Sequence, residues 1–298
     1  MKKDLLTILD LDSSEILSLI RRGLELKRLG RKADRSLTGY TLGLLFEKAS
    51  TRTRVSFQAG MYRMGGQTLF LSKADTQLSR GETAADTARV LSRYLDILAI
   101  RTYSQELVEE IARHASIPVI NALTDRYHPC QVLSDLMTVQ EKRGGLDRMK
   151  VAWVGDGNNV AHSWINAARV LGFKLVLACP SAYRPLPEVL GNFANITLVE
   201  DPREAASGSD VINTDVWVSM GQEKEKAQRI KDFQSYQVNG DLVRLGKPGV
   251  MIMHCLPAHR EEEITSEVLD GPNSVVFDQA ENKMWLHQAL LEKLLLRD

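Results

Sequence analysis

Residues 46–54 have the composition of an anion-binding site. The segment reads Phe-Glu-Lys-Ala-Ser-Thr-Arg-Thr-Arg, so that three hydroxyls and two guanidinium groups fall within five residues. Guanidinium groups donate paired, charge-assisted hydrogen bonds that suit phosphate and carboxylate oxygens. The chemistry predicted from these side chains is the binding of such an anion. Taken alone, the segment also fits an ordinary Ser/Thr helix cap followed by solvated arginines.

The sequence on either side predicts how these residues are positioned. The apolar run 40–46 predicts a buried strand, and the helical spacing of Phe57, Met61 and Met64 predicts a helix. Residues 50–53 would then lie at the helix N-terminus. Free backbone N–H groups and the positive end of the helix dipole favour a phosphate or carboxylate there.

Composition restricts the classes of protein that fit. The chain has 298 residues, of which 44% are hydrophobic, so it can bury a full core, and its length suits two medium domains. Its 38 basic side chains balance 38 acidic ones, so neither nucleic acid nor an anionic membrane is an expected partner. Acidic residues interrupt the apolar positions of residues 1–20, which argues against a signal peptide or membrane span there.

The cysteines are odd in number and widely spaced. They are Cys130, Cys179 and Cys255, and none belongs to a Cys-x-x-Cys pair. This pattern predicts reduced thiols in a cytoplasmic protein and argues against a disulfide framework or a zinc site.

Apolar runs of strand length alternate with helical stretches along the whole chain. Strands are expected at 40–46, 68–71, 95–100, 118–121, 150–155, 173–179, 196–199, 211–214, 249–253 and 274–277. The alternation restarts after Gly144-Gly145. We therefore expect an α/β fold of two doubly wound domains with mostly parallel sheets, residues 1–145 and 146–280. A final helix, 281–295 within the segment 281–298, is expected to pack back on the first domain.

Polar clusters come directly after the predicted strands. They are residues 50–54, Arg101, 128–131, 156–159, 215–222, 254–257 and 279–283. In open parallel α/β sheets, ligands bind outside the carboxyl ends of the strands. We therefore expect an active-site cleft between the two domains, with Arg52 and Arg101 accessible to solvent.

Five of these segments, in chain order, resemble the motifs of the aspartate/ornithine carbamoyltransferase superfamily, and of its ornithine branch in particular. They are Ser-Thr-Arg-Thr-Arg at 50–54, His-Pro-Cys-Gln at 128–131, Gly-Asp-Gly-Asn-Asn at 155–159, Asp-Val-Trp-Val-Ser-Met-Gly-Gln-Glu at 215–223 and His-Cys-Leu-Pro at 254–257. The resemblance implies a transferase that moves the carbamoyl group of carbamoyl phosphate to the δ-amine of L-ornithine, giving L-citrulline and phosphate. It implies no cofactor and no metal. The expected role is in arginine biosynthesis, with the degradative direction left open.

The resemblance also implies a carbamoyl phosphate site. Residues 50–53 match the family's phosphate loop, and Arg101 matches its carbonyl and phosphate arginine. His128 and Gln131 match its carbonyl and amide contacts. Charge grows on the carbonyl oxygen as the amine attacks, and prearranged donors there act as an oxyanion hole. The full set implied is Ser50, Thr51, Arg52, Thr53, Gln77, Arg101, His128, Gln131, Cys255, Leu256 and Lys283.

For the acceptor, the resemblance implies contacts to the α-amino and α-carboxylate groups of ornithine. The residues that match are Asn159, Asp215, Ser219 and Met220. An amine of this kind has a pKa near 10.4, so only about one molecule in 10³ is neutral at pH 7. Asp215 and Cys255 are candidates for orienting the amine or easing its proton away, and they join Arg101 and His128 as the expected catalytic residues.

Two positions call for separate comment. Relatives usually carry Arg after Glu-Asn in the last motif, whereas this chain has Lys283. Lysine keeps the charge but not the planar, two-pronged donation. In this family the loop equivalent to 72–82 reaches into a neighbouring subunit of a trimer, so Gln77 is expected to act across an interface in a homotrimer or a multiple of trimers.

Three alternatives stay open at this stage. A nicotinamide dehydrogenase would use the glycines of 155–160, but the third small residue of the fingerprint and a ribose-binding carboxylate are missing. A binding protein could keep the cleft without activity. Within the enzyme class, putrescine or an acylated ornithine could be the acceptor.

Overall fold

The computed structural model describes residues 3–30, 35–72, 74, 76–219 and 221–296. The chain folds into two compact units. The first contains residues 1–141 and 280–298, and the second contains residues 142–279. The chain leaves the first unit within α5 (Pro129–Arg143) and returns to it within α12 (Val276–Leu295).

The first unit is built on a four-stranded parallel sheet. Its strands are β1 (Thr41–Phe46), β2 (Gln67–Ser72), β3 (Ile97–Arg101) and β4 (Val119–Leu123), and the spatial order is β2-β1-β3-β4. β3 is buried along its whole length, and β1 is buried except at Thr41. Continuous apolar runs such as these are typical of parallel strands covered on both faces.

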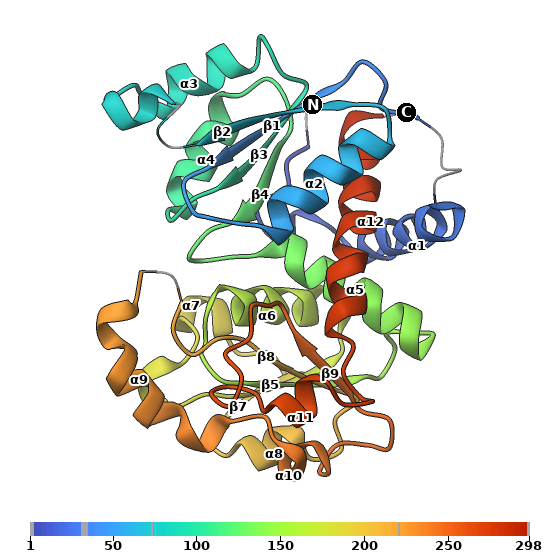
Figure 1. Ribbon diagram of the computed structural model, residues 1–298, viewed down its shortest axis with the longest axis vertical. Helices are drawn as coiled ribbons and strands as arrows, with labels where there is room; N and C mark the ends of the chain where they lie inside the picture. The colour runs from blue at the N-terminus through green and yellow to red at the C-terminus, as the bar shows by residue number, and fades with distance from the viewer. Residues whose placement is uncertain (1–2, 31–34, 73, 75, 220, 297–298) are drawn as a thin grey trace. The chain divides into compact units, whose positions relative to one another are not determined.

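Helices cover both faces of this sheet (Figure 1). On one face, α3 (Ala84–Leu91) and α4 (Gln105–His114) bury Ala88, Val108 and Ile111 against β1, β3 and β4. The other face carries α1 (Ser13–Leu29), α2 (Arg52–Arg63), α5 and α12. Asp12 and Glu15 form a capping box at the start of α1.

The second unit is built on a five-stranded parallel sheet with the spatial order β7-β6-β5-β8-β9. The strands are β5 (Lys150–Val154), β6 (Lys174–Ala178), β7 (Ile196–Val199), β8 (Val211–Thr214) and β9 (Met251–His254). α6 (Asn159–Leu171) covers one face. The other face packs against α8 (Pro202–Ala206), α9 (Lys226–Phe233), α10 (Gly240–Val243) and α11 (Ser266–Leu269).

 Both units are thus doubly wound α/β domains with parallel sheets, as the sequence predicted.

The structure corrects two sequence predictions near the C-terminus. Residues 274–277 do not form a strand, since Ser274 makes only an isolated bridge to Ile252. Gln279 donates its backbone N–H to Val275, so helical hydrogen bonding starts there. α12 therefore begins at Val276, five residues before the expected start at 281. The β-branched run misled the prediction because tertiary packing overrides intrinsic propensity.

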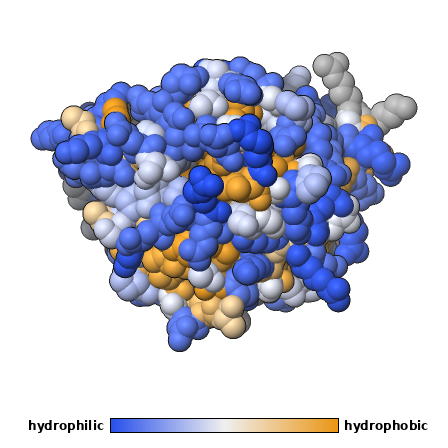
Figure 2. All heavy atoms as spheres, turned by 90° about the horizontal axis from the view of Figure 1, so that it is seen from below, coloured by the Kyte–Doolittle hydropathy of each residue, from blue (hydrophilic) through white to orange (hydrophobic). Residues whose placement is uncertain are grey.

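The surface is mostly polar where it can be seen. Figure 2 shows hydrophilic side chains over most of one face, with smaller hydrophobic areas between them. Among the described residues, no helix is both long and apolar enough to cross a membrane.

Candidate active site

In the first domain, the predicted anion-binding residues start from neighbouring strand ends. The chain runs from β1 to β2 on one side and then crosses to β3 on the other, so the winding reverses between β1 and β3. The register pairs Phe46 with Arg101, and the Glu47 backbone N–H donates to the Arg101 carbonyl at 2.8 Å. Ligands of open α/β sheets bind at such a reversal point. Strand order thus brings the segment 50–54 and Arg101 to the same edge of the sheet.

The start of α2 differs from an ordinary capped helix. Thr51 occupies the N-cap position, and its side chain makes no capping hydrogen bond to any residue that the structure describes. Its hydroxyl and the first N–H groups of α2 are therefore available to an anion. Arg54, by contrast, lies over the Phe70 ring, 3.5 Å from its centroid, and donates to Gln58. Of the two arginines in the segment, Arg52 is the one suited to a ligand.

Arg101 is buried, with 7% of its surface exposed, so the expectation that it is solvent-accessible is wrong. The residue ends β3, whose five residues are all buried, and the strand carries its side chain into the interior. Its guanidinium is positively charged, so it favours an anionic ligand at this strand end.

His128 immediately precedes α5 and is almost fully buried. Burial lowers its pKa well below the ordinary value, and the positive charges of Lys283 and Arg101 lower it further. The imidazole is consequently neutral near pH 7 and has one N–H to donate. A neutral donor beside two cations suits a carbonyl oxygen that gains negative charge during a reaction.

Gln131 and Lys283 lie together in the first domain. The Lys283 ammonium donates to Oε1 of Gln131 at 2.8 Å, and both side chains are buried. α5 supplies the glutamine and α12 supplies the lysine, so the contact joins residues 152 positions apart. With Arg101 and His128, they form a buried cationic cluster.

In the second domain, the winding reverses between β5 and β8. The register pairs Val154 with Thr214 and Thr214 with His254, so β5, β8 and β9 end level with one another. The residues that follow these strands are Gly155, Asp215 and Cys255. The polar clusters predicted at 156–159, 215–222 and 254–257 therefore leave the same edge of the sheet.

Asp215 is the centre of this second cluster. Its carboxylate accepts hydrogen bonds from Asn158 Nδ2 at 2.8 Å, from the Val216 N–H at 2.8 Å and from Cys255 Sγ at 3.0 Å. A carboxylate has about four acceptor sites. Asp215 therefore keeps room for one more donor, and its negative charge favours a cationic one. Asn158 also caps α6, which fixes its amide in place.

Cys255 differs from the other two cysteines. Burial raises the pKa of Cys130 to about 12 and raises the pKa of Cys179 even more, as expected for inert core thiols. Cys255 is only partly buried and donates to Asp215. It is therefore the one of the three cysteines that is partly exposed and bonded to a charged side chain.

A buried histidine and glutamate support the loop that carries Cys255. His254 Nε2 lies 3.0 Å from Oε1 of Glu263, and His254 Nδ1 accepts the Leu256 N–H at 2.9 Å. The Leu256 bond assigns Nδ1 as the acceptor, so Nε2 carries the proton that Glu263 accepts. Leu256 itself has a φ of 57°, in the left-handed region that leucine rarely adopts. No local sequence signal points to Glu263, which lies nine residues beyond its partner.

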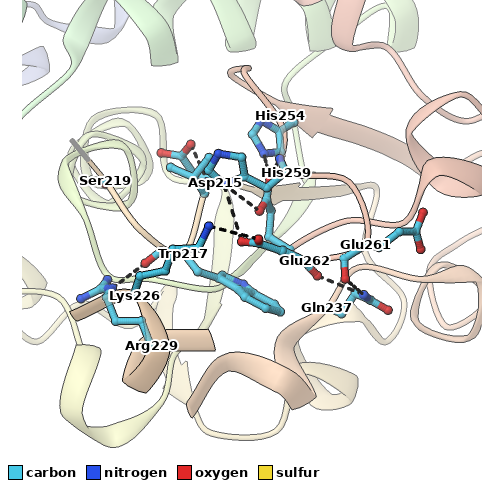
Figure 3. A network of polar contacts seen from close by, with 12 residues as sticks. Asp215, Trp217, Ser219, Lys226, Arg229, Gln237, His254, His259, Glu261 and Glu262 are labelled. Atoms are coloured by element: carbon cyan, nitrogen blue, oxygen red, sulfur yellow. Dashed lines mark hydrogen bonds and ion pairs between the residues drawn. The ribbon is translucent and has the colours of Figure 1, made fainter. Parts of the chain in front are cut away.

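Arg229, on α9, anchors the start of the segment 215–222 (Figure 3). Its Nε donates to the Trp217 carbonyl at 2.5 Å, and its Nη2 bonds the carboxylate of Asp156. Burial raises the pKa of Asp156 to about 6, an effect that the guanidinium opposes. Sequence reasoning missed Arg229, because its partner Asp156 is 73 positions away.

The positions of the other predicted site residues say less about their roles. Asn159 is the first residue of α6, and the Ser219 N–H donates to Gln222 at 3.0 Å. Met220 lies outside the described residues. Gln77 is exposed at the start of a short 3₁₀ helix, where it has no role in the core.

The glycines of the segment 155–159 serve packing within the chain. Gly155 has a φ of 130°, which disfavours any other residue. A Cβ on Gly157 would lie 2.2 Å from the Pro185 nitrogen, so the segment's own neighbour occupies that space. In a dinucleotide fingerprint, the glycine at such a place lets a pyrophosphate approach. This packing argues against the dehydrogenase alternative.

Two doubly wound domains, each with polar side chains at the reversal of its winding, define a class of two-domain α/β proteins that bind small ligands. Comparison with known proteins gives the family. Residues 3–141 match the family model described as "Aspartate/ornithine carbamoyltransferase, carbamoyl-P binding domain". Residues 147–294 match the one described as "Aspartate/ornithine carbamoyltransferase, Asp/Orn binding domain". The chain belongs to the aspartate/ornithine carbamoyltransferase family.

Individual relatives align along nearly the whole chain. It is 54% identical to the ornithine carbamoyltransferase of Desulfotalea psychrophila, over 96% of this chain and 97% of that protein. It is 51% identical to the ornithine carbamoyltransferase of Bacillus subtilis, over 99% of this chain and 94% of that protein. Among solved structures, the ornithine carbamoyltransferase from Pyrococcus furiosus aligns with a TM-score of 0.95 and 46% identity, covering 100% of this chain and 98% of that one.

Proposed function

We propose that this protein transfers the carbamoyl group of carbamoyl phosphate to the δ-amine of L-ornithine, giving L-citrulline and phosphate. The observation that carries the choice of acceptor is the Asp215 cluster, in which a carboxylate held by Asn158 and Cys255 keeps room for a cationic donor. Ornithine offers an α-ammonium and a second amine. The names of the full-length relatives support the same acceptor.

For carbamoyl phosphate, the proposed ligands of the phosphate are residues 50–53, at the N-terminus of α2. Arg101 is proposed to contact the phosphate and the carbonyl oxygen. The neutral His128 imidazole is proposed to donate to that carbonyl oxygen, and Gln131 to contact the carbamoyl amide. A doubly charged ligand would offset the positive charges of Arg52, Arg101 and Lys283.

For ornithine, Asp215 is proposed to accept the α-ammonium, with Asn159, Ser219 and Met220 holding the α-groups. The Cys255 thiol and Leu256 are proposed to lie near the δ-amine and the carbamoyl group. The neutral amine forms a bond to the carbonyl carbon, and the bond from that carbon to the phosphate oxygen then breaks. Phosphate leaves with the electron pair of that bond and takes up the proton that the amine loses, so it departs as hydrogen phosphate. Donors at the carbonyl oxygen stabilise the charge that develops between these two events.

The assembly and location of the protein belong to the same proposal. We expect a cytoplasmic enzyme of arginine biosynthesis that is assembled as a homotrimer. The exposed Gln77 would then contribute to a neighbouring subunit's site. Sedimentation equilibrium tests the trimer, and Gln77→Ala should reduce activity without changing the sedimentation behaviour.

The function is tested by following phosphate release from carbamoyl phosphate in the presence and absence of L-ornithine. Release should depend on ornithine and equal the citrulline formed. Norvaline keeps the α-groups but lacks the δ-amine, so it should compete with ornithine once carbamoyl phosphate is bound. Phosphate release that ignores ornithine, or no release at all, would remove this proposal.

A further inference from the structure

A row of three buried side chains runs from α12 into α5. Lys283 Nζ donates to Oε1 of Gln131 at 2.8 Å, and Nε2 of Gln131 donates to Oδ1 of Asp135 at 2.8 Å. Lys283 is 4% exposed, Gln131 is 2% exposed and Asp135 is fully buried. An amide thus bridges an ammonium and a carboxylate in the interior of the first domain.

This arrangement determines which way the Gln131 amide faces. With the amide turned over, its NH₂ group would meet the Lys283 ammonium, and its oxygen would meet the Asp135 carboxylate. The first contact would join two donors and the second would join two acceptors, because an ammonium only donates and a carboxylate only accepts. Both mismatches would be buried, where an unsatisfied polar group is costly. Lys283 and Asp135 therefore select one orientation.

The charges at the two ends also strengthen both hydrogen bonds. The cation faces the amide oxygen and the anion faces the amide N–H, so each charge meets the complementary end of the amide dipole. Bonds to ionised partners are roughly twice as strong as neutral ones. The oxygen of Gln131 is consequently held in place with one acceptor position remaining, since an amide oxygen has two.

We propose that Lys283 and Asp135 are positioning residues that fix Gln131 with its oxygen toward the NH₂ group of carbamoyl phosphate. This inference rests on the proposed function. It gives Lys283 a role through Gln131, whereas the family resemblance implied that Lys283 contacts carbamoyl phosphate directly. It also assigns a role to Asp135, which no motif singled out. The fixed oxygen would make the site selective for an acyl phosphate that carries an NH₂ group.

The selectivity can be measured with acetyl phosphate, in which a methyl group replaces the NH₂ group. The experiment determines KM for carbamoyl phosphate and the inhibition constant of acetyl phosphate in the wild type, Lys283→Met, Asp135→Asn and the double variant. In the wild type, carbamoyl phosphate should be favoured. Each single variant should weaken carbamoyl phosphate about tenfold, as expected for one hydrogen bond, and change acetyl phosphate little. The selectivity ratio should therefore fall about tenfold.

The double variant tests whether both residues act through one amide. The loss of selectivity in the double variant should be smaller than the product of the two single losses, because both residues act on the same amide. Lys283→Arg should keep the wild-type ratio, since a guanidinium can also donate to the amide oxygen. Lys142→Met is a matched control, because that lysine pairs with Asp278 in the second domain.

Several results would overturn the inference. One is a ratio that stays constant while both phosphates bind more weakly, which would indicate a merely structural role. Another is a double variant whose effect equals the product of the single effects. If Asp135→Asn fails to fold, the selectivity for carbamoyl phosphate over acetyl phosphate in Lys283→Met and Lys283→Arg still tests the inference. If the wild type forms no citrulline, the proposed function fails, and calorimetric binding of the two phosphates still tests the selectivity.

Discussion

The thiol sulfur of Cys255 lies 3.0 Å from Oδ1 of Asp215, although the two residues are 40 positions apart. The parallel register of β8 and β9 pairs Thr214 with His254, so the residues that follow them leave the sheet side by side. The contact therefore depends on strand order and register rather than on local sequence. It joins the two motifs that we propose contact ornithine.

Replacing Asp215 with Asn should weaken the use of ornithine strongly. The substitution removes the charge that we propose pairs with the α-ammonium, and hydrogen bonds to charged groups contribute about 1.5–3 kcal/mol each. KM for ornithine should rise about 100-fold, as measured by steady-state citrulline formation. KM for carbamoyl phosphate should change less than about threefold, because its proposed ligands are mostly in the other domain.

The exposed Asp241→Asn is the control for this change, since its partner Arg244 lies on the surface. A variant of Asp215 that keeps the wild-type KM for ornithine would contradict the proposed acceptor contact. An equal loss in both KM values would point instead to a general distortion of the second domain.

Arg52→Ala and Arg101→Ala should each lower activity about 100-fold or more, because each removes a charged donor from the proposed anion site. They should differ in stability. Arg52 is partly exposed, whereas Arg101 is buried at the end of β3, where it pairs with β1. Only Arg101→Ala should therefore lower the melting temperature clearly. Thermal unfolding and citrulline assays on the same preparations check both statements. Normal turnover in either variant would contradict the anion site.

His128 should make the protein sensitive to acid. Its folded pKa lies well below the ordinary value, so below about pH 6.5 the unfolded chain binds a proton that the native state does not. The free energy of unfolding should then fall by up to about 1.4 kcal/mol per pH unit from this group as the pH drops. His287 should contribute in the same direction, because burial also lowers its pKa.

Urea unfolding of wild type and His128→Asn between pH 5 and 7.5 measures this effect. The variant should lose stability less steeply below about pH 6.5, by the equivalent of one proton, with no difference in slope above pH 7. Parallel curves across the whole range would show that His128 takes up a proton in the native state too.

Gly157→Ala should be strongly destabilising, because the new methyl group would collide with the backbone at 184–185. Overpacking of this kind costs about 1–3 kcal/mol, and backbone yields less than a flexible side chain. Gly145→Ala is the matched control, since no atom lies within 4 Å of its added Cβ and its backbone is not left-handed. Equal unfolding free energies for the two variants would mean that the segment 184–185 moves aside easily.

Much of the fold follows from periodicity. The strands of both domains were predicted because continuous apolar runs are a local pattern. The strand predicted at 274–277 was wrong because contacts distant in the sequence, rather than the local pattern, determine the structure there. Val275, Val276 and Phe277 favour a strand locally, but their contacts with β9 and the course of α12 decide the outcome.

The candidate site could be predicted only in part, for a related reason. Arg101 follows an apolar strand, which is a visible signal, yet its burial depends on the surrounding helices. Arg229 and its partner Asp156 are 73 positions apart, so they become neighbours only after folding. Asp135 lies one helical turn from its partner Gln131, but no motif marks the pair. Supporting residues of this kind need the three-dimensional arrangement.

The most direct test of the central claim is the rate of carbamoyl transfer to a panel of acceptors. The value of kcat/KM should be compared for L-ornithine, N-acetylornithine, putrescine and L-aspartate at one concentration of carbamoyl phosphate. A site that pairs a carboxylate with the α-ammonium should favour ornithine by about 10³-fold or more, because the other acceptors leave buried polar groups unpaired or bring a second carboxylate toward Asp215. Faster transfer to putrescine, N-acetylornithine or aspartate would contradict the account.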